Sequence, residues 1–473
     1  MSVLITKNDV PVSNEGAKFT VRLEKSGDSY IPYHPKYTEW TEEDYYNSDL
    51  KWCEPMTAHA LEDEAEQDNA LWNPDNFIEE KFDGTRGILH ILDGECRVFS
   101  RRISKKTNWF TENTDSLPQM RSINIPELAG TIIDGEMFIP NKPFKDVSST
   151  LNCKWDKAID RQLELGLIVF HAFDILYYKG IKLENMRLER RKYYLGKVIQ
   201  KLKEHGVESI VEVPYFKCDG KLSIPVERPL SLLKRIKGFD KKYPTLYSEI
   251  CISSSPLNLK LSPRGYYEFI VATGGEGVII KNKDCKYVHK RDKAYLKIKK
   301  FYTREAIILG FTEPTKEYKG KFPNDSWEYW EKGNIVSNDW GKYSAKELLK
   351  KGYTPVTKYY YENWVGNIIF GVIITDDEIK KLPKNKKFNI HEVEIKEQPC
   401  NDVTVYKVLE VGECAGFDEE VREKLSERDI GKVIEVKCNE IFKDTGKLRH
   451  PRFLRFREDK SPTECTYYNH ITE

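Results

Sequence analysis

Short apolar runs separated by turn residues fill the chain from residue 51 to about residue 302, and a single long amphipathic helix stands among them. The helix is predicted by apolar residues on one face and a glycine beyond its end, namely Leu188, Leu195, Val198, Ile199, Leu202 and Gly206. This mixture of strands and helix predicts an α+β fold for residues 51–302.

From residue 303 onward strand patterns dominate, over 306–311, 367–374, 403–411 and 433–441. One short helix interrupts them, with Asp418 near its start, with Phe417, Val421 and Leu425 at helical spacing, and with Gly431 beyond its end. These strands and the helix suggest a small barrel over 303–473. Residues 323–366 are predicted as an insertion between its first two strands, and residues 1–50 as an accessory segment.

The chain of 473 residues is long enough for two or three domains. Its 76 basic and 75 acidic side chains give a net charge of +1, so any affinity for phosphate must come from local clusters. The ten cysteines form no Cys-x-x-Cys pair, which favours a reducing compartment and argues against structural zinc. We see neither a secretory signal nor a membrane-spanning run, and we therefore expect a soluble cytoplasmic protein.

The segment Lys81-Phe82-Asp83-Gly84-Thr85-Arg86 places a lysine directly before an Asp-Gly turn, at the expected end of a strand. A lysine there can act as a nucleophile when burial, neighbouring cations or a metal disfavour its charged form. The alternative is a surface hairpin, because Asp-Gly is a common turn pair.

Further short motifs follow in the order Ser100-Arg101-Arg102, Ile132-Ile133-Asp134-Gly135-Glu136, Phe170-His171-Ala172-Phe173-Asp174-Ile175-Leu176, Glu276-Gly277-Val278-Ile279-Ile280-Lys281, Tyr295-Leu296-Lys297-Ile298-Lys299 and the stretch from Arg449 to Lys460. Each is weak alone, but chance occurrence of the whole series is negligible. In this order the motifs resemble those of the covalent nucleotidyltransferase superfamily, and most of all those of ATP-dependent DNA ligases. The resemblance covers roughly residues 52–460.

This resemblance implies a nucleotidyltransferase (adenylation) domain of antiparallel sheets and helices over 51–302, followed by an OB-fold domain over 303–473. It implies ATP as the donor of AMP and a monomer that seals nicks in double-stranded DNA. No stretch before Lys81 is long enough for the helical DNA-embracing domain of large eukaryotic ligases, so we expect a compact phage or viral type.

Physical chemistry suggests roles for five of the motif residues. Glu136 and Glu276 offer hard oxygen ligands for Mg²⁺ or Mn²⁺, or contacts to the ribose. Lys281, Lys297 and Lys299 can neutralise phosphate charge as the transition state spreads it. Lys297 and Lys299 alternate along a strand, so both ammonium groups reach one face.

Further roles are implied only by the resemblance. Lys81 carries the AMP, Glu79 lies near the adenine amino group, and Phe173 stacks on adenine. Arg86 contacts the ribose or a DNA phosphate, and Asp83 serves when the 3′-hydroxyl attacks. In the last motif, Arg457 and Lys460 orient the leaving pyrophosphate.

Basic clusters support a nucleic-acid partner. Eight basic residues lie between Lys286 and Arg304 against the single acid Asp292, and seven lie between Lys443 and Lys460 against three acids. The residues proposed for DNA are Arg101, Arg102, Lys290, Arg291, Arg452 and Arg455. Arg101 and Arg102 compete for the same phosphate, which can belong to AMP or to the DNA 5′ end.

Two alternatives stay open. Messenger-RNA capping guanylyltransferases share the lysine motif, the Glu-Gly segment and an Arg-x-Asp-Lys ending, and RNA ligases belong to the same superfamily. A nucleic-acid-binding relative that has lost its chemistry would keep the fold, although the intact Lys81, Glu136 and Glu276 argue against it.

Overall fold

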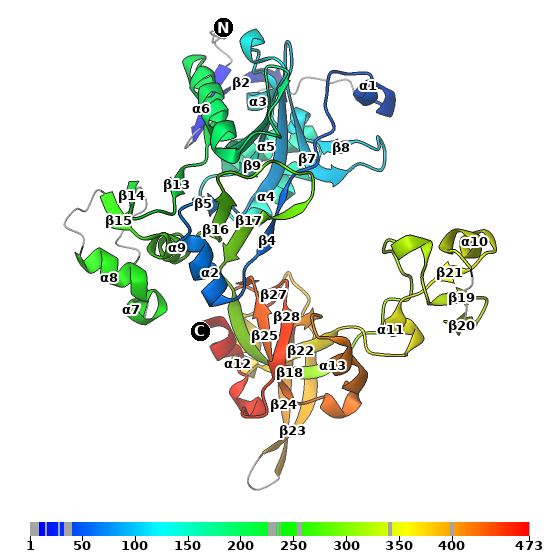
Figure 1. Ribbon diagram of the computed structural model, residues 1–473. Helices are drawn as coiled ribbons and strands as arrows, with labels where there is room; N and C mark the ends of the chain where they lie inside the picture. Colours follow the sequence, from blue (N-terminus) through cyan, green and yellow to red (C-terminus); the bar gives the residue numbers. More distant parts are fainter. Residues whose placement is uncertain are drawn as a thin grey trace. The chain divides into compact units, whose positions relative to one another are not determined.

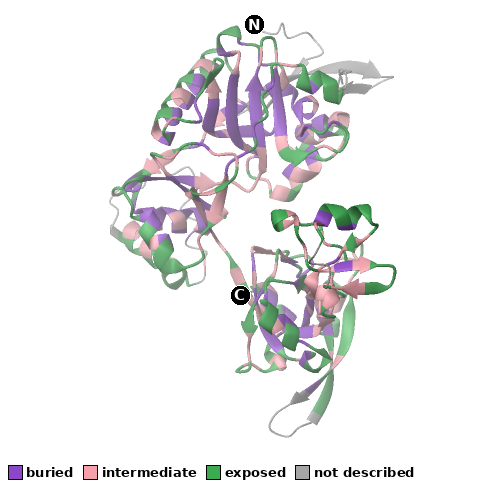
Figure 2. Cartoon of the chain, turned by 45° about the vertical axis from the view of Figure 1, so that its right-hand side comes forward, coloured by how far each residue is buried: buried purple, intermediate pink, exposed green. Residues whose placement is uncertain are grey.

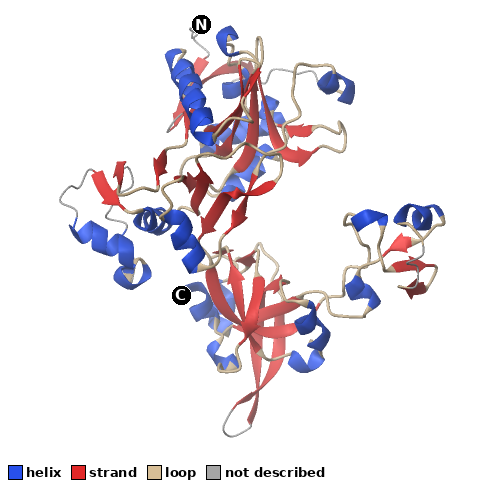
Figure 3. Cartoon of the chain, viewed as in Figure 1, coloured by secondary structure: helices blue, strands red, loops and turns tan. Residues whose placement is uncertain are grey.

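The structure is a computed structural model that describes residues 9–14, 17–26, 29–32, 40–225, 233, 236, 238–252, 258–338, 343–397 and 402–472. Its contacts divide the chain into two compact units, Met1–Lys299 and Lys300–Glu473. Both units mix helices with mainly antiparallel sheets (Figures 1 and 3), so the predicted α+β class is confirmed. The parallel pairs in the two large sheets of the first unit are β10 with β12 and β17 with β4.

The larger sheet of the first unit has seven strands, six of them in the order β11-β10-β9-β6-β7-β8, with β12 pairing with β10. Their bounds are β6 Thr85–Ile91, β7 Cys96–Ile103, β8 Phe110–Glu112, β9 Thr131–Phe138, β10 Val169–Tyr178, β11 Ile181–Lys182 and β12 Ile210–Glu212. One face is covered by α3 (Pro118–Arg121), α4 (Phe144–Leu151), α5 (Trp155–Leu165) and α6 (Leu188–Glu204), whose apolar side chains pack with the sheet in one core. Figure 2 shows these strands as largely buried.

A second sheet has five strands in the order β13-β5-β16-β17-β4. Their bounds are β4 Thr57–Ala60, β5 Asn76–Lys81, β13 Tyr215–Lys217, β16 Gly277–Asn282 and β17 Arg291–Lys299. Helices α2 (Glu64–Leu71) and α9 (Pro263–Ala272) pack on this sheet through a separate core. Nearby are β14 (Leu222–Pro225) paired with β15 (Asn258–Leu261), and the helices α7 (Phe239–Lys242) and α8 (Pro244–Ile252).

The two sheets of the first unit share a third apolar cluster. Phe77 and Tyr295 reach it from the five-stranded sheet, and Ile88, Ile132 and Leu176 reach it from the seven-stranded sheet. Consecutive strands β5 and β6 therefore belong to different sheets and do not pair with each other. The surface-hairpin alternative for the Asp-Gly turn is wrong, because that turn carries the chain from one sheet to the other.

The long helix predicted from Leu188 to Leu202 is confirmed as α6, which buries all five of the predicted apolar residues. Gly206, just after the helix, has a φ of +74°, a left-handed conformation that glycine adopts without strain. Before these two sheets in the sequence come β1 (Asp9–Asn14), β2 (Ala17–Ser26), β3 (Ser29–Pro32) and α1 (Glu42–Tyr46). The ring of Tyr45 from α1 stacks on Trp109, which attaches this helix to the β7–β8 hairpin.

The second unit is built on a six-stranded sheet in the order β23-β24-β22-β18-β25-β28. The bounds are β18 Tyr302–Phe311, β22 Ile368–Ile373, β23 Ile390–Glu397, β24 Asp402–Cys414, β25 Val433–Cys438 and β28 Arg452–Phe456. Without β23, the order is that of a five-stranded OB-fold with α13 (Glu419–Lys424) between its third and fourth strands. One parallel bridge, Ala415 to Arg452, joins the end of β24 to β28, so the described strands form a partly open barrel and not a fully closed one.

Two predicted elements of this unit are shorter than expected. The strand expected over 433–441 ends at Cys438, and Glu440–Ile441 pairs instead with Leu448–Arg449. The helix begins after its N-cap Asp418 as predicted, but Phe417 precedes it and Leu425 is its extended C-cap. All of these apolar side chains still reach the core of the unit, which explains their helical spacing.

Between β18 and β22 the chain forms a small structure of its own. It contains β19 (Trp330–Lys332), β20 (Ile335–Ser337) and β21 (Thr354–Pro355) in one sheet, with α10 (Ala345–Lys350) and α11 (Lys358–Tyr361). Trp330, Ala345 and Leu348 form its core. After β22 follow α12 (Asp376–Lys381) and, at the end of the chain, α14 (Tyr467–Thr472). Among the described helices, none is both long and apolar enough to cross a bilayer.

Candidate active site

Lys81 is the last residue of β5, and its ammonium group is half-buried beside Glu276. Lys81 Nζ donates a hydrogen bond to Glu276 Oε2 and another, of 3.3 Å, to the carbonyl of Phe82. The other oxygen of Glu276 forms an ion pair with Lys299 of β17. One carboxylate thus joins the two lysines from neighbouring parts of the five-stranded sheet.

A glycine fixes the position of Glu276. Gly277 has a φ of +144°, and a Cβ there would lie 2.1 Å from the carbonyl oxygen of Ile298. Only glycine allows β16 to lie this close to β17, and the preceding Glu276 is thereby directed at both lysines.

Lys297 adds a third cation. It pairs in register with Ile279, while Lys299 pairs with Gly277, so the two lysines share one face of β17 as predicted. Burial lowers the pKa of Lys297, and the charges of Lys299 and Lys81 lower it further. Lys81 and Lys299 share the Glu276 carboxylate, and Lys297 is on the same face of β17 as Lys299, an arrangement of three cations suited to a polyphosphate.

The seven-stranded sheet contributes Arg86 and Glu136, which face each other across β6 and β9. Arg86 binds both oxygens of buried Asp134, at 2.5 and 2.6 Å. Asp134 also accepts a hydrogen bond of 2.6 Å from Tyr287, whose hydroxyl accepts one of 2.9 Å from the amide of Met56. Arg86 is therefore held rigidly.

Glu136 lies in an environment that disfavours its charge. Burial raises the pKa of Glu136 to about 7, although the charges of Lys81 and Arg86 oppose that rise and Glu276 supports it. A divalent cation nearby would favour the ionised carboxylate, so the pair of Glu136 and Glu276 fits the Mg²⁺ that we expect.

In the turn between β5 and β6, Gly84 leaves no room for a side chain, because a Cβ would lie 2.3 Å from the carbonyl oxygen of Met137. Asp83 lies in the same turn, between β5 and β6.

Phe173 lies at a break in the register of β9 and β10, where His171 pairs with Glu136 and Asp174 pairs with Asp134. Such a bulge redirects the extra side chain. The half-buried ring has the Arg86 guanidinium 4.6 Å and the Lys281 ammonium 4.3 Å from its centroid.

Glu79 is two residues before Lys81 on β5 and is only 2% exposed. Lys281, predicted to face phosphate, is equally buried, and its Nζ lies 2.7 Å from Glu79 Oε2. Burial lowers the pKa of Lys281. The structure thus brings Lys281 to Glu79 and Phe173, the predicted adenine contacts.

The predicted DNA-binding residues of the first unit are exposed: Arg101, Arg102, Lys290 and Arg291. Successive residues of β7 point to opposite faces of the sheet. Phe99 pairs with Ile88, and Arg86 is two residues before Ile88, so Phe99 is on the face that carries Arg86. The pairing of β7 with β6 ends at Ser100, and its pairing with β8 is irregular between Phe99 and Ile103. Continued alternation would place Arg101 on the Arg86 face and Arg102 on the opposite face.

Four predicted residues belong to the second unit. Arg457 binds both oxygens of Asp459 at 2.8 Å and pairs with Glu305, and Lys460 lies 3.0 Å from Glu464. Arg452 and Arg455 are exposed on β28, and Arg455 lies 2.7 Å from Glu435.

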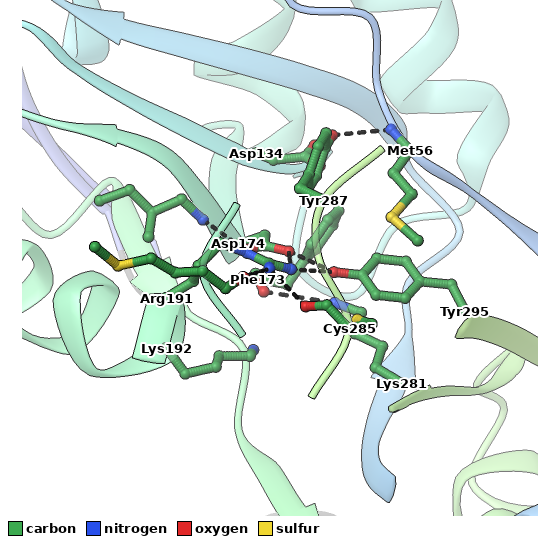
Figure 4. A network of polar contacts seen from close by, with 12 residues as sticks. Met56, Asp134, Phe173, Asp174, Arg191, Lys192, Lys281, Cys285, Tyr287 and Tyr295 are labelled. Atoms are coloured by element: carbon green, nitrogen blue, oxygen red, sulfur yellow. Dashed lines mark hydrogen bonds and ion pairs between the residues drawn. The ribbon is translucent and has the colours of Figure 1, made fainter. Parts of the chain in front are cut away.

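Sequence reasoning missed the buried charges that support the site. Asp174 binds Arg191 of α6 at 2.8 and 3.0 Å and accepts a hydrogen bond from Tyr295, and Lys192 lies beside Lys281 (Figure 4). Burial pushes the pKa of Asp174 upward, but Arg191 outweighs it and holds the pKa at about 2. A signal was present, because Arg191 and Lys192 occupy the apolar face of a helix that is otherwise regular.

Residues 55–215 match the family described as the ATP dependent DNA ligase domain. This part of the chain is therefore similar to the ATP-dependent DNA ligase domain. The match contains Lys81, Glu136 and Phe173, and it ends before Glu276.

Individual DNA ligases are similar to a larger part of the chain than residues 55–215. DNA ligase 2 of Methanosarcina acetivorans is 28% identical over 405 residues, which are 82% of this chain and 53% of that protein. The DNA ligase of Methanococcus maripaludis strain C7 is 24% identical over 391 residues, 81% of this chain and 53% of its own length. The chain thus spans about half the length of these curated relatives. Among solved structures, a Lig E DNA ligase aligns with 85% of this chain and 99% of its own, at 17% identity and a TM-score of 0.42.

Proposed function

We propose that the protein is an ATP-dependent DNA ligase that seals nicks with a 5′-phosphate and a 3′-hydroxyl in duplex DNA. The observation that carries the proposal is the position of Lys81, which lies within the stretch that matches the ligase domain. Glu276 and Lys299, from beyond that stretch, complete a cluster of charges around its ammonium group. A lysine exposed on the surface before an Asp-Gly turn would have no such partners.

The proposed reaction has three displacements at phosphorus. Lys81 Nζ, after losing a proton, attacks the α-phosphorus of ATP, and the bond to pyrophosphate breaks. A DNA 5′-phosphate oxygen then attacks the AMP phosphorus and releases the lysine. Finally the 3′-hydroxyl attacks the DNA 5′-phosphorus, AMP leaves, and a phosphodiester bond is formed. The covalent adenylate divides one difficult condensation into easier steps.

The chain's own residues would mainly orient groups and balance charge. Lys297 and Lys299 would stabilise charge on the phosphates, and Asp83 would serve the attack of the 3′-hydroxyl. Phe173 would stack on adenine while Glu79 accepts a hydrogen bond from its amino group. Arg86, fixed by Asp134, would contact the ribose or a DNA phosphate. Glu136 and Glu276 would hold Mg²⁺ or Mn²⁺, which neutralises phosphate charge when bound.

The remaining roles concern DNA and the second unit. Arg101, Lys290, Arg291, Arg452 and Arg455 would bind DNA phosphates, and Arg457 with Lys460 would orient the pyrophosphate of ATP. We further propose that the protein acts as a cytoplasmic monomer on nicked double-stranded DNA. The compact phage or viral type stays a prediction, since the relatives named above are archaeal.

The deciding experiment incubates the purified protein with Mg²⁺ and α-labelled ATP or GTP, and then adds nicked duplex DNA. We expect an acid-stable protein label from ATP alone, its disappearance in Lys81→Ala, and its discharge as the nick closes. Lys145→Ala, which changes an exposed lysine of α4, is the matched control and should label like the wild type.

Other outcomes identify the alternatives. Labelling by GTP would indicate a capping-type guanylyltransferase. Labelling by ATP with discharge onto nicked RNA and not onto nicked DNA would indicate an RNA ligase. No labelling by either nucleotide would indicate a nucleic-acid-binding relative and would overturn the proposal.

A further inference from the structure

Helix α6 places two consecutive cations on its buried face. Arg191 is 0% exposed and Lys192 is 1% exposed, on a face that otherwise consists of leucine, isoleucine and valine. A buried charge is costly unless it is paired, so each cation should have an identifiable partner.

The partners lie on either side of the candidate nucleotide site. Arg191 binds Asp174, the neighbour of Phe173 on β10. The Nζ of Lys192 lies 2.5 Å from Oε1 of Glu79, while Lys281 holds the other oxygen of the same carboxylate. One helix therefore supports both residues expected to contact the nucleobase, and Figure 4 shows Lys192 and Lys281 next to the Asp174 network.

The contact between Lys192 and Glu79 is an ion pair without hydrogen-bond geometry. Within the described part of the chain, Glu79 Oε1 is buried and has no hydrogen-bond donor. The carboxylate is thus held by charge on both sides, and because each carboxylate oxygen has two lone pairs, Oε1 can accept a hydrogen bond in addition to its contact with Lys192. A buried acceptor of this kind suits an amino group of a ligand.

Lys192 is also fixed from its other sides. Its Nζ lies 4.5 Å from the ring centroid of Tyr215, and Tyr215 pairs in register with Glu79. Burial raises the pKa of Glu212, and the charge of Lys192 opposes that rise. If Lys192 moved away from Glu79, it would also leave the ring of Tyr215.

We propose that Lys192 is a positioning residue that holds the Glu79 carboxylate in place, and thereby sets the preference for a base with a 6-amino group. This inference rests on the proposed function. Adenine presents an N–H donor to the carboxylate, whereas guanine presents a carbonyl oxygen that the carboxylate repels. Without Lys192, the carboxylate is held on one side only and discriminates less.

The test measures self-adenylylation with Mg²⁺ and three nucleotides: ATP, GTP, and purine riboside triphosphate, which lacks the 6-amino group. In Lys192→Met we expect the KM for ATP to rise about tenfold or more, with a smaller change in kcat. The preference for ATP over purine riboside triphosphate should fall by a similar factor, and Lys192→Arg should recover part of it. Lys197→Met, on the exposed face of α6, should keep the wild-type preference.

A double-mutant cycle separates positioning from stability. Once Glu79 is replaced by Gln, adding Lys192→Met should change the nucleotide preference little, because the group being positioned is gone. If Lys192→Met does not fold, Lys192→Gln provides the same comparison. An unchanged preference in folded variants of Lys192, or an equal further loss in the Glu79→Gln background, would overturn the inference. Failure of the wild type to label with ATP would instead overturn the proposed function.

Discussion

Lys81 Nζ donates a hydrogen bond to Glu276 Oε2, across the pairing of β5 with β16. Because Glu276 also pairs with Lys299, it is the only described carboxylate shown to form ion pairs with both of these lysines. We predict that Glu276→Gln lowers the rate of Lys81 adenylylation on the order of 100-fold, since the site loses a charge that both orients Lys81 and suits a metal. Single-turnover labelling with α-labelled ATP measures this rate.

The matched control for this change is Glu66→Gln, an exposed glutamate of α2 outside the site. It should label at the wild-type rate. A Glu276→Gln protein that labels as fast as this control would show that the carboxylate is dispensable.

Asp174 gives a prediction about acid stability. The pKa of Asp174 is about 2 in the folded protein, against an ordinary value of 3.8. Its charge therefore stabilises the fold above about pH 4, and this contribution, about 2 kcal/mol, is lost as the pH falls through about 2. Asp174→Asn should be less stable than the wild type at neutral pH, because Arg191 loses its partner, and the difference should shrink in acid.

Urea unfolding at several pH values compares Asp174→Asn with the wild type and with Asp93→Asn, a change in an exposed turn. Asp93→Asn should follow the wild-type pH dependence. A constant difference between Asp174→Asn and the wild type from neutral pH to about pH 2 would contradict the assignment.

Two glycines should respond in opposite ways to replacement by alanine. Gly277→Ala forces a side chain into a φ of +144° and against Ile298, so we expect a loss of stability of about 1–3 kcal/mol and a displaced Glu276. Gly196 lies inside α6, and a Cβ there would meet only Glu212 Oε2 at 3.8 Å. Gly196→Ala should therefore stabilise the fold by about 0.5–1 kcal/mol. Thermal unfolding followed by circular dichroism measures both, and equal effects at the two positions would contradict the geometry.

Local patterns in the sequence predict much of this structure. The apolar face of α6, the alternation of Lys297 and Lys299, and the strand end at Lys81 all follow from periodicity within a few residues. The pairings that complete the site do not, because they join residues far apart in the chain. Glu276 meets Lys81 only because β16 inserts beside β5, and the charges of Arg191 and Lys192 override the apolar pattern of their helix. The alternative of a surface hairpin at Asp83-Gly84 is wrong for the same reason, since no local sequence pattern indicates that β5 and β6 belong to different sheets.

The alternation of β7 favours Arg101 over Arg102 as the residue that contacts phosphate. The last residue of β7 paired with β6 is Ser100, and if the alternation continues beyond it, Arg101 shares the face of Arg86 and Arg102 faces away. Each phosphate that a cationic side chain neutralises contributes about 0.9 to the slope of log affinity against log salt concentration. We therefore predict that Arg101→Ala makes the salt dependence of binding to nicked duplex shallower by about that amount, and that Arg102→Ala leaves it nearly unchanged. Fluorescence anisotropy over a series of salt concentrations measures both slopes, with Arg190→Ala as an exposed control on α6. The reverse result would mean that the strand rotates beyond its last paired residue, and it would transfer the phosphate contact to Arg102.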